Sequence, residues 1–161
     1  MAKSKYTRRD YTIAEAAYMA GLMDGEGTFF IGNYSKTKNQ FFQTVLRITS
    51  TDKCMIEWAK STFGGWMNEY TSKQRAANCK GPVWSWGCTG ERLDHICEIM
   101  LPYLVAKKKQ AQILLDMRKT YHGSEHQKGK WGTQGLSQSI LDERIRLMKR
   151  LQSLHCRNYS S

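Results

Sequence analysis

The chain has 161 residues, the usual size of one domain, which is long enough to bury a hydrophobic core. Its 25 Lys and Arg residues against 14 Asp and Glu residues give a formal net charge of +11. This charge indicates a polyanionic partner and favours nucleic acid over an anionic membrane surface. The sequence has no apolar run long enough to span a bilayer and no apolar signal segment, so we expect an intracellular protein with no membrane partner.

The five cysteines include no C-x-x-C pair, which is unlike a secreted disulfide framework or a zinc ribbon. Cys88, His95 and Cys97 lie close together in sequence, but their spacing matches none of the common zinc patterns. We therefore predict reduced thiols and no zinc site.

The first predicted helix begins near Ile13, because Thr12 and Glu15 form an S/T-x-x-E capping box. At about 100° per residue, one face of this helix carries small residues and one carboxylate: Ala17, Ala20, Gly21, Asp24 and Gly25. The opposite face carries the bulky side chains of Tyr18, Met19, Leu22 and Met23. Ala17, Gly21 and Gly25, at i, i+4 and i+8, form a stripe of small residues that lets a second helix approach closely, and the chain has no second copy of the segment "MAGLMDGEG". The stripe therefore predicts a two-fold contact with the same helix of another subunit.

A β-hairpin is predicted next. After Gly27 the pattern changes to that of a strand over residues 28 to 34, and a polar loop separates it from a second strand over residues 40 to 48. One face of the second strand suits a core, with Phe42, Thr44, Leu46 and Ile48. The other face carries Phe41, Gln43, Val45 and Arg47, of which the polar members are suited to contact a ligand.

The next segment, residues 51 to 63, is predicted to be a helix that ends at Gly64 and Gly65. Its inward residues are expected to be Met55, Ile56, Ala59 and Phe63. A second hairpin follows, with strands over residues 66 to 74 and 83 to 89, and then a helix over residues 91 to 101.

Two further helices complete the pattern. The first covers residues 102 to 121, with one side made of Ala106, Gln110, Ile113, Leu114, Met117 and Tyr121. The last begins near Ser137, and its charged residues are typical of a solvated face: Arg144, Lys149, Arg150 and Arg157. The order helix, two strands, helix, two strands, helices predicts an α+β fold with one four-stranded antiparallel sheet backed by helices. We expect a single domain over residues 1–161, with a core at about 13–121 and a C-terminal loop and helix at 122–161.

The segment "MAGLMDGEG", Met19 to Gly27, resembles the nine-residue signature of the LAGLIDADG homing endonucleases. The residues that match outright are Ala20, Gly21, Leu22, Asp24 and Gly27. Glu26 replaces the penultimate aspartate of the signature with another carboxylate, and "LPYLVAKKKQAQ" resembles the later family segment that carries a basic catalytic-site residue. The resemblance covers roughly residues 13 to 120 and implies the αββαββα core of that family.

The resemblance implies a site-specific homing endonuclease that acts as a homodimer. Such an enzyme makes a metal-dependent double-strand break in a long, near-palindromic target in double-stranded DNA. Two alternatives are an intron maturase, or another DNA-binding protein of the same fold without cleavage activity, and a structural dimer whose charge is incidental. The carboxylate at Glu26 argues against both alternatives.

The resemblance also implies roles for individual residues. Glu26 and the carbonyl of Gly25 are expected to bind Mg²⁺ or Mn²⁺, while Ca²⁺ is expected to support DNA binding without cleavage. Lys107 aligns with the basic catalytic-site residue, although Lys108 and Lys109 leave that choice open, and Ser50 stands where a polar residue is expected. The expected dimer interface consists of Ala17, Ala20, Gly21 and Asp24.

Plainer interpretations exist for these residues. Glu26 alone is compatible with an ordinary turn residue, Asp24 with a cap or salt bridge, and the three lysines with a solvated helix start. Trp84 and Trp86 share a strand face, and tryptophan pairs are found more often in cores than as stacking platforms, so they receive no role.

DNA contact is expected on the sheet face opposite the helices, because a two-stranded ribbon fits the major groove. Gln43 and Arg47 are the main candidates for contacts to base edges. The other candidates, whose lysines are suited to phosphate contacts, are Tyr34, Lys36, Lys38, Asn68, Tyr70, Ser72, Lys73 and Arg75.

Overall fold

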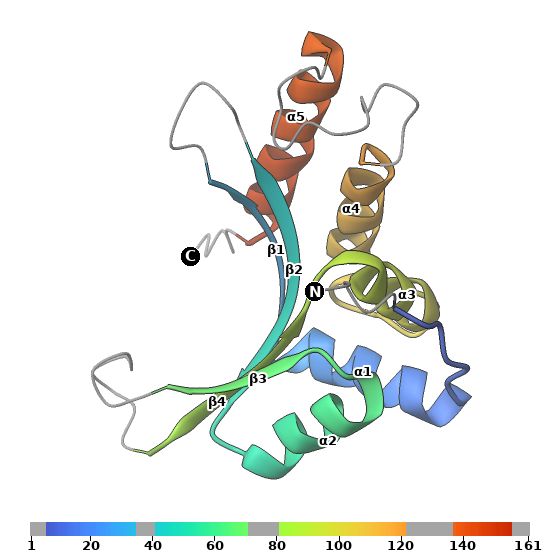
Figure 1. Cartoon of the computed structure of the whole chain (residues 1–161), viewed down its shortest axis with the longest axis vertical. Helices are drawn as coiled ribbons and strands as arrows, with labels where there is room; N and C mark the ends of the chain where they lie inside the picture. Colours follow the sequence, from blue (N-terminus) through green and yellow to red (C-terminus); the bar gives the residue numbers. More distant parts are fainter. Residues whose placement is uncertain (1–5, 35–40, 71–80, 122–136, 156–161) are drawn as a thin grey trace, which may run out of the picture. The chain divides into compact units, whose positions relative to one another are not determined.

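The structure is a computed structural model that describes residues 6–34, 41–70, 81–121 and 137–155. Its elements (Figure 1) are α1 (Ile13–Gly25), β1 (Gly27–Asn33), β2 (Phe42–Ser50), α2 (Lys53–Phe63), β3 (Trp66–Tyr70), β4 (Val83–Cys88), α3 (Gly90–Met100), α4 (Lys108–Lys119) and α5 (Gln138–His155). The strands form one antiparallel sheet in the order β1-β2-β4-β3. The α+β class and the four-stranded sheet are therefore confirmed. None of the helices in the described ranges is both long and apolar enough to cross a membrane.

The chain divides into two compact units. The first consists of Met1–Thr28 and Val45–Lys108, and the second of Phe29–Thr44 and Lys109–Ser161. The first unit therefore holds α1, α2, α3, β3 and β4, while the second holds α5 and almost all of α4. Strands β1 and β2 contribute residues to both units. The single domain over residues 1–161 stays a prediction.

Helix α1 begins where the capping box predicts. The Glu15 amide donates to Thr12 Oγ1 at 3.1 Å, and the Thr12 amide donates to Glu15 Oε2 at 2.8 Å. These bonds satisfy two of the amides that the first turn of a helix leaves without partners, and they hold the pKa of Glu15 below its usual value.

The small face predicted on α1 is partly buried in its own chain. The buried residues follow the spacing i, i+3, i+4, i+7: Ala16, Met19, Ala20 and Met23. Ala20 therefore belongs to the core of its own chain, while Ala17, Gly21 and Gly25 are exposed. Tyr18 is half exposed, and its ring meets the edge of the Trp58 ring at 4.5 Å between centroids.

The core of the first unit lies between its helices and the sheet. Helix α2 contacts β3 and β4, and α1 contacts α3. Ile56, Ala59 and Phe63 are buried as predicted, whereas Met55 is only half buried. The helix ends at Gly64, whose φ of 70° suits glycine, and the Gly64 carbonyl accepts a hydrogen bond from Trp86 Nε1 at 2.6 Å.

The predicted helix over residues 102 to 121 starts too early. Helix α4 begins at Lys108, and the residues before it form turns. The physical reason is that the amides of Val105 and Lys107 donate to the Asp24 carboxylate instead of to carbonyls one turn earlier. Ala106 is consequently exposed, and Ala111 takes a place in the core.

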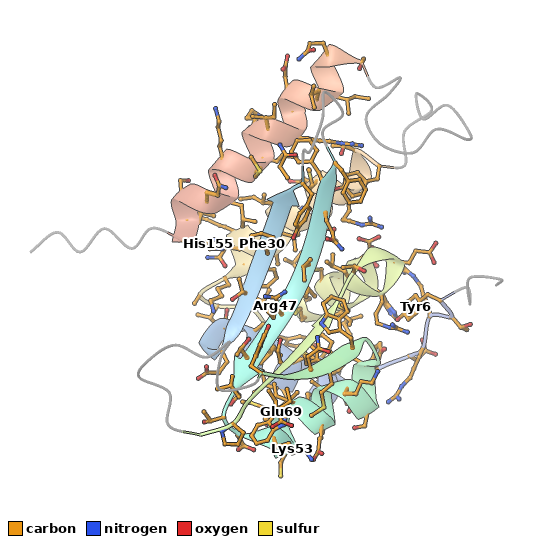
Figure 2. The ribbon with its side chains drawn as sticks, turned by 60° about the vertical axis from the view of Figure 1, so that its left-hand side comes forward. Tyr6, Phe30, Arg47, Lys53, Glu69 and His155 are labelled. Carbon is orange, nitrogen blue, oxygen red and sulfur yellow. The ribbon has the colours of Figure 1, made fainter. Side chains whose placement is uncertain are left out.

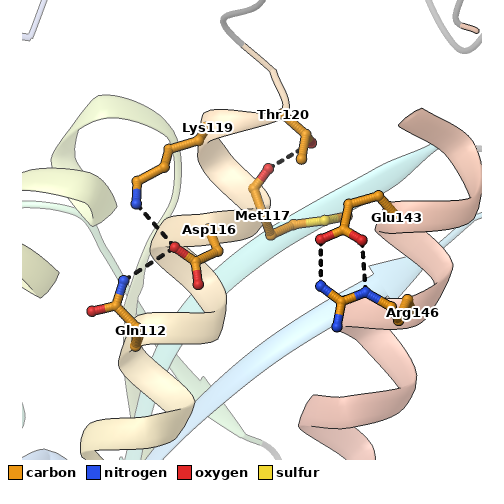
Figure 3. Close-up of polar contacts among 7 residues, drawn as sticks. All are labelled: Gln112, Asp116, Met117, Lys119, Thr120, Glu143 and Arg146. Atoms are coloured by element: carbon orange, nitrogen blue, oxygen red, sulfur yellow. Dashed lines mark hydrogen bonds and ion pairs between the residues drawn. The ribbon is translucent and has the colours of Figure 1, made fainter. Parts of the chain in front are cut away.

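The solvated charges predicted on the last helix are partly right. Figure 3 shows two sets of local pairs in the second unit, Lys119 Nζ with Asp116 Oδ1 at 2.9 Å and Arg146 with Glu143 at 2.6 Å. Such exposed pairs contribute little to stability. Arg144, however, is only 5% exposed, so its assignment to a solvated face is wrong.

Arg144 links α5 to the end of α4. Its Nε donates to Thr120 Oγ1 and its Nη2 donates to the Thr120 carbonyl, both at 2.9 Å. The guanidinium lies over the Tyr121 ring at 4.5 Å, and Tyr121 Oη donates to the Phe42 carbonyl at 3.1 Å. A guanidinium supplies several donors in one plane, so it can make these contacts while buried.

We predict that Arg144→Ala lowers the free energy of unfolding by about 2–3 kcal/mol, because two charge-assisted hydrogen bonds are lost. Urea unfolding measures this change. Lys149→Ala on the exposed side of the same helix is the control and should shift stability by less than about 0.5 kcal/mol. Equal unfolding midpoints for the two variants would contradict the structural role of Arg144.

Candidate functional site

The junction between α1 and β1 is a tight exit from a helix into a strand. The Glu26 amide donates to the Leu22 carbonyl at 2.8 Å, and Gly27 already belongs to β1. A Cβ atom at Gly27 would lie 2.5 Å from the Met23 Cα, so only glycine fits there. Gly25, by contrast, has open space where a Cβ would be, so within one chain this junction does not require a glycine at that position. The Glu26 residue is left exposed at the end of the helix.

Asp24 holds the turn that precedes α4. Its Oδ2 accepts the Val105 amide and its Oδ1 accepts the Lys107 amide, each at 2.8 Å. Hydrogen bonds between backbone amides and a charged carboxylate are stronger than neutral ones. Asp24 therefore braces a segment of its own chain, and its carboxylate oxygens are engaged there.

Lys107 lies at the same junction. Its Nζ donates to the Met23 carbonyl at 2.9 Å and to the Gly27 carbonyl at 2.7 Å, so it bonds to the backbone on both sides of Glu26. Lys107 is half buried, whereas Lys108 and Lys109 are exposed on α4. Among Lys107, Lys108 and Lys109, it is therefore Lys107 whose ammonium group bonds to the backbone of the α1–β1 junction. The sequence could not distinguish them, because the contact joins residues about eighty positions apart.

The donor set at the junction suits a hard cation only in part. Glu26 offers an exposed carboxylate, and Mg²⁺ prefers oxygen ligands and is often bound by one or two carboxylates together with substrate phosphates. Across the described ranges, no group of three or more His, Cys, Asp or Glu side chains is arranged to hold a metal. These residues fit a Mg²⁺ ion whose remaining ligands come from a phosphate, water or a second chain.

Ser50 takes part in the start of α2. Its Oγ accepts the Asp52 amide at 3.0 Å, and Asp52 in turn caps the helix by accepting from the amides of Cys54 and Met55. Its catalytic role stays a prediction.

Two buried cysteines and His95 of the first unit are engaged in packing, whereas Cys54 is exposed. Cys88 and Cys97 are buried, and burial raises the pKa of each thiol. His95 Nδ1 lies 2.9 Å from Tyr6 Oη, and burial lowers the pKa of this histidine. The Tyr11 ring stands between His95 and Phe63, with a centroid distance of 5.3 Å to His95.

The sheet of the first unit has two distinct faces. Strand pairing sets Ile48 opposite Trp86, and both are fully buried, so this face packs on the helices. Trp86 is thereby a core residue, and Trp84 shares its face. The other face carries the alternate residues, among which Arg47 is exposed. Figure 2 labels Arg47 on β2 and Glu69 on β3.

The strand register brings several predicted residues to this outer face. Arg47 pairs with Gly87, which pairs with Trp66, and Thr49 pairs with Ser85, which pairs with Asn68. Residues opposite one another in antiparallel strands share a face. Tyr70, two residues beyond Asn68, lies on this face as well. The outer face of the first unit thus carries Arg47, Thr49, Trp66, Asn68, Tyr70 and Ser85.

Sequence reasoning missed three of these residues, Thr49, Trp66 and Ser85. A Cβ atom at Gly87 would lie 2.5 Å from Trp66 Cζ2, which shows that the Trp66 ring covers Gly87. Ser85 is buried, and its Oγ has no hydrogen-bond partner in the part of the chain that the structure describes. Alternation along β4 was the available signal, but the partner strand was needed to assign the face.

The remaining predicted residues fall into two groups. In the second unit, Tyr34 is exposed and Gln43 is half buried. Five others lie outside the described residues: Lys36, Lys38, Ser72, Lys73 and Arg75.

Comparison with known proteins gives matches among solved structures. No family model matches the chain, and no curated protein matches it. The homing endonuclease I-CvuI in complex with its target in the presence of Ca matches with a TM-score of 0.68 and 19% identity, over 92% of this chain and 87% of that chain. A second I-CvuI complex, in the presence of Mg with the DNA not cleaved, has a TM-score of 0.68 and 20% identity, over 92% of this chain and 86% of that one.

Two further structures extend this finding. The archaeal intron-encoded homing endonuclease I-Vdi141I complexed with DNA has a TM-score of 0.69 and 16% identity, over 91% of this chain and 87% of that chain. The LAGLIDADG homing endonuclease I-SmaMI bound to cleaved DNA has a TM-score of 0.67 and 15% identity, over 97% of this chain but only 50% of that chain. Together with the helix, junction and sheet described above, these matches identify the fold of the chain as that of the LAGLIDADG homing endonucleases.

Proposed function

We propose that this chain is a site-specific DNA endonuclease that makes a metal-dependent double-strand break in a long, near-palindromic target as a homodimer. The observation that carries the proposal is the α1–β1 junction. At this junction Asp24 accepts the backbone amides of Val105 and Lys107. The Lys107 ammonium group donates to the carbonyls of Met23 and Gly27. Glu26, which lies between Met23 and Gly27 in the sequence, is exposed. A carboxylate can hold a metal ion and an ammonium group can stabilise negative charge, so the junction suits metal-assisted phosphodiester hydrolysis.

Two observations support a homodimer. Ala17, Gly21 and Gly25 form an exposed stripe on α1, and neither glycine has a heavy atom within 4 Å of the place where a Cβ would be. The chain also covers 87% of I-CvuI and of I-Vdi141I but only 50% of I-SmaMI. A chain of this length would therefore need a second copy to match the whole length of I-SmaMI. A two-fold contact along α1 brings the Glu26 residues of both chains together. Asp24 then supports the interface from within its own chain, and Ala20 offers no surface to a partner because it is buried.

The roles of the junction residues follow from their chemistry. Glu26 and the Gly25 carbonyl bind Mg²⁺ or Mn²⁺, which when bound activates water and stabilises the charge that develops on the phosphate. Lys107 holds positive charge beside the scissile phosphate, and its position is maintained by the Asp24 carboxylate. Ser50 orients water from the end of β2. Ca²⁺ supports binding without cleavage.

DNA binds to the outer face of the sheet. The net charge of +11 favours a polyanion, and Arg47 and Asn68 are exposed on this face. A guanidinium can donate two hydrogen bonds to guanine in the major groove, which assigns base recognition to Arg47. Lysines of the two hairpin loops bind phosphates, which position the duplex.

Recovery of cleaved sites from a random DNA library tests the function. We expect a long, imperfect palindrome to be enriched in Mg²⁺ and no enrichment in EDTA. Binding of one sequence without cleavage would instead indicate a maturase or a DNA-binding protein of this fold, and no binding at all would refute the proposal.

Glu26→Gln is predicted to abolish cleavage while site-specific binding survives, because the amide keeps the shape and loses the charge that binds the cation. Gel shift and cleavage in Mg²⁺ and in Ca²⁺ measure both properties. The matched variant Asp24→Asn should instead lower thermal stability, because an amide group has only one oxygen to accept the two backbone amides. Full cleavage by Glu26→Gln would remove this residue from the mechanism.

Gly21→Leu is predicted to produce a folded monomer without cleavage activity, because leucine separates the two α1 helices. The open space at Gly21 means that leucine creates no clash inside one chain, and leucine favours helix formation more than glycine does. Far-UV circular dichroism should therefore be unchanged while sedimentation shows the monomer. A wild-type protein that cleaves DNA as a monomer would contradict the dimer.

Arg47→Ala is predicted to cost about 1–3 kcal/mol of binding free energy and to relax preference at one base pair per half-site. Binding to a set of targets that each carry one base change measures the effect. Equal losses on all sequences would show that Arg47 contacts the backbone rather than a base.

A further inference from the structure

Three exposed aromatic side chains lie in the hairpin of the second unit. Phe30 is 42% exposed, Tyr34 is 54% exposed and Phe41 is 49% exposed. Phe30 lies between the buried Phe29 and Ile31 of β1, and Phe41 directly precedes the buried Phe42 of β2. We call Phe30, Tyr34 and Phe41 the aromatic patch. Figure 2 labels Phe30 on β1.

Two contacts place the three rings on one face. The Tyr34 amide donates to the Phe41 carbonyl at 2.8 Å, so these residues stand opposite one another in the hairpin. At Gly32, a Cβ atom would lie 2.6 Å from Tyr34 Cε2 and 2.8 Å from Phe30 Cε1. The rings of Phe30 and Tyr34 therefore cover Gly32 from both sides, and the absence of a side chain there brings them together.

DNA combines the polyanionic character that the net charge of the chain favours with apolar groups that suit an aromatic patch. The net charge of +11 favours DNA, and the half-buried Gln43 lies two residues from Phe41 on the same side of β2. In the major groove the 5-methyl group of thymine is the apolar feature that distinguishes one base pair from the others, and phenylalanine is a suitable contact for it. Exposed aromatic rings on a DNA-binding sheet therefore have a specific apolar target.

We propose that the aromatic patch recognises the 5-methyl groups of thymines in each half of the DNA target. The proposal rests on the proposed function, since it assigns a further sequence preference to the same DNA-binding activity. It adds apolar recognition by Phe30, Tyr34 and Phe41 to the hydrogen bonds expected from Arg47.

Deoxyuridine provides the test, because it differs from thymidine only by the missing methyl group. Duplexes of the selected target, each with one thymine replaced by uracil, are titrated with the full chain by gel shift in Ca²⁺. At thymines that contact the patch, each replacement should weaken binding about fourfold, the value for one buried CH₂ group. The ratio of the affinities for the thymine and uracil duplexes should not change with salt concentration, whereas both affinities should fall as the salt concentration rises.

Variants identify the patch as the cause. In the Phe41→Thr and Phe30→Thr variants, replacing thymine by uracil should no longer weaken binding at the thymine that the lost ring contacts. Threonine is chosen because it is well tolerated in strands. Tyr34→Phe keeps the ring and should preserve the effect. Leu154→Thr, on the exposed end of α5, is the matched control for loss of an exposed apolar side chain and should change nothing.

The outcomes separate the two proposals. Site-specific binding that is equal on thymine and uracil at every position overturns the aromatic recognition and leaves the nuclease proposal standing. The aromatic recognition is also overturned if replacing thymine by uracil still weakens binding in both the Phe30→Thr and the Phe41→Thr variant. It is overturned as well if either variant is monomeric while the wild-type protein is dimeric, because the patch would then contact a second chain. Absence of DNA binding overturns both proposals. If a threonine variant fails to fold, the comparison of thymine with uracil on the wild-type protein decides.

Discussion

The carboxylate of Asp24 is the contact on which the proposed site depends. It accepts the backbone amides of Val105 and Lys107, which lie in the turn just before the first residue of α4. Because the turn is held there, Lys107 Nζ reaches the Met23 and Gly27 carbonyls. A cation near the C-terminal end of a helix interacts favourably with the last carbonyls, and this ammonium group does so at the Met23 carbonyl of α1. One side chain thus positions the ammonium group beside the exposed Glu26 residue.

Helix α1 combines a structural and a proposed recognition role on separate faces. Ala16, Met19, Ala20 and Met23 bury one stripe in the chain, while Gly21 and Gly25 keep another stripe exposed and free of side chains. Glycine inside a helix costs about 0.5–1 kcal/mol relative to alanine. Close packing of another surface on Gly21 and Gly25 would offset this loss of helix stability. The glycine at position 27 has a different cause, because the backbone of Met23 occupies the space of a Cβ there.

Local features of the fold could be predicted from the sequence, because their causes lie within a few residues. The capping box at Thr12, the end of α2 at Gly64 and the strand alternation around Ile48 all belong to this class. The α+β class follows from the order of such elements. The signature around Asp24 added the family resemblance.

The features that could not be predicted depend on contacts between distant residues. The start of α4 and the distinction of Lys107 from its neighbours both result from the contact with the α1–β1 junction, which no local pattern records. The burial of Arg144 accompanies its bonds to Thr120, which directly follows α4. Ser85 and Trp66 needed the strand register before their face could be assigned.

The measurement that tests the account most directly is the location of Mn²⁺ by anomalous scattering in crystals of the chain with its selected DNA target. The account predicts a Mn²⁺ signal within coordination distance of the Glu26 carboxylate and a target phosphate, with Glu26 of a second chain at the same centre. A crystal with DNA on the sheet and no Mn²⁺ signal beside Glu26 would contradict the central claim.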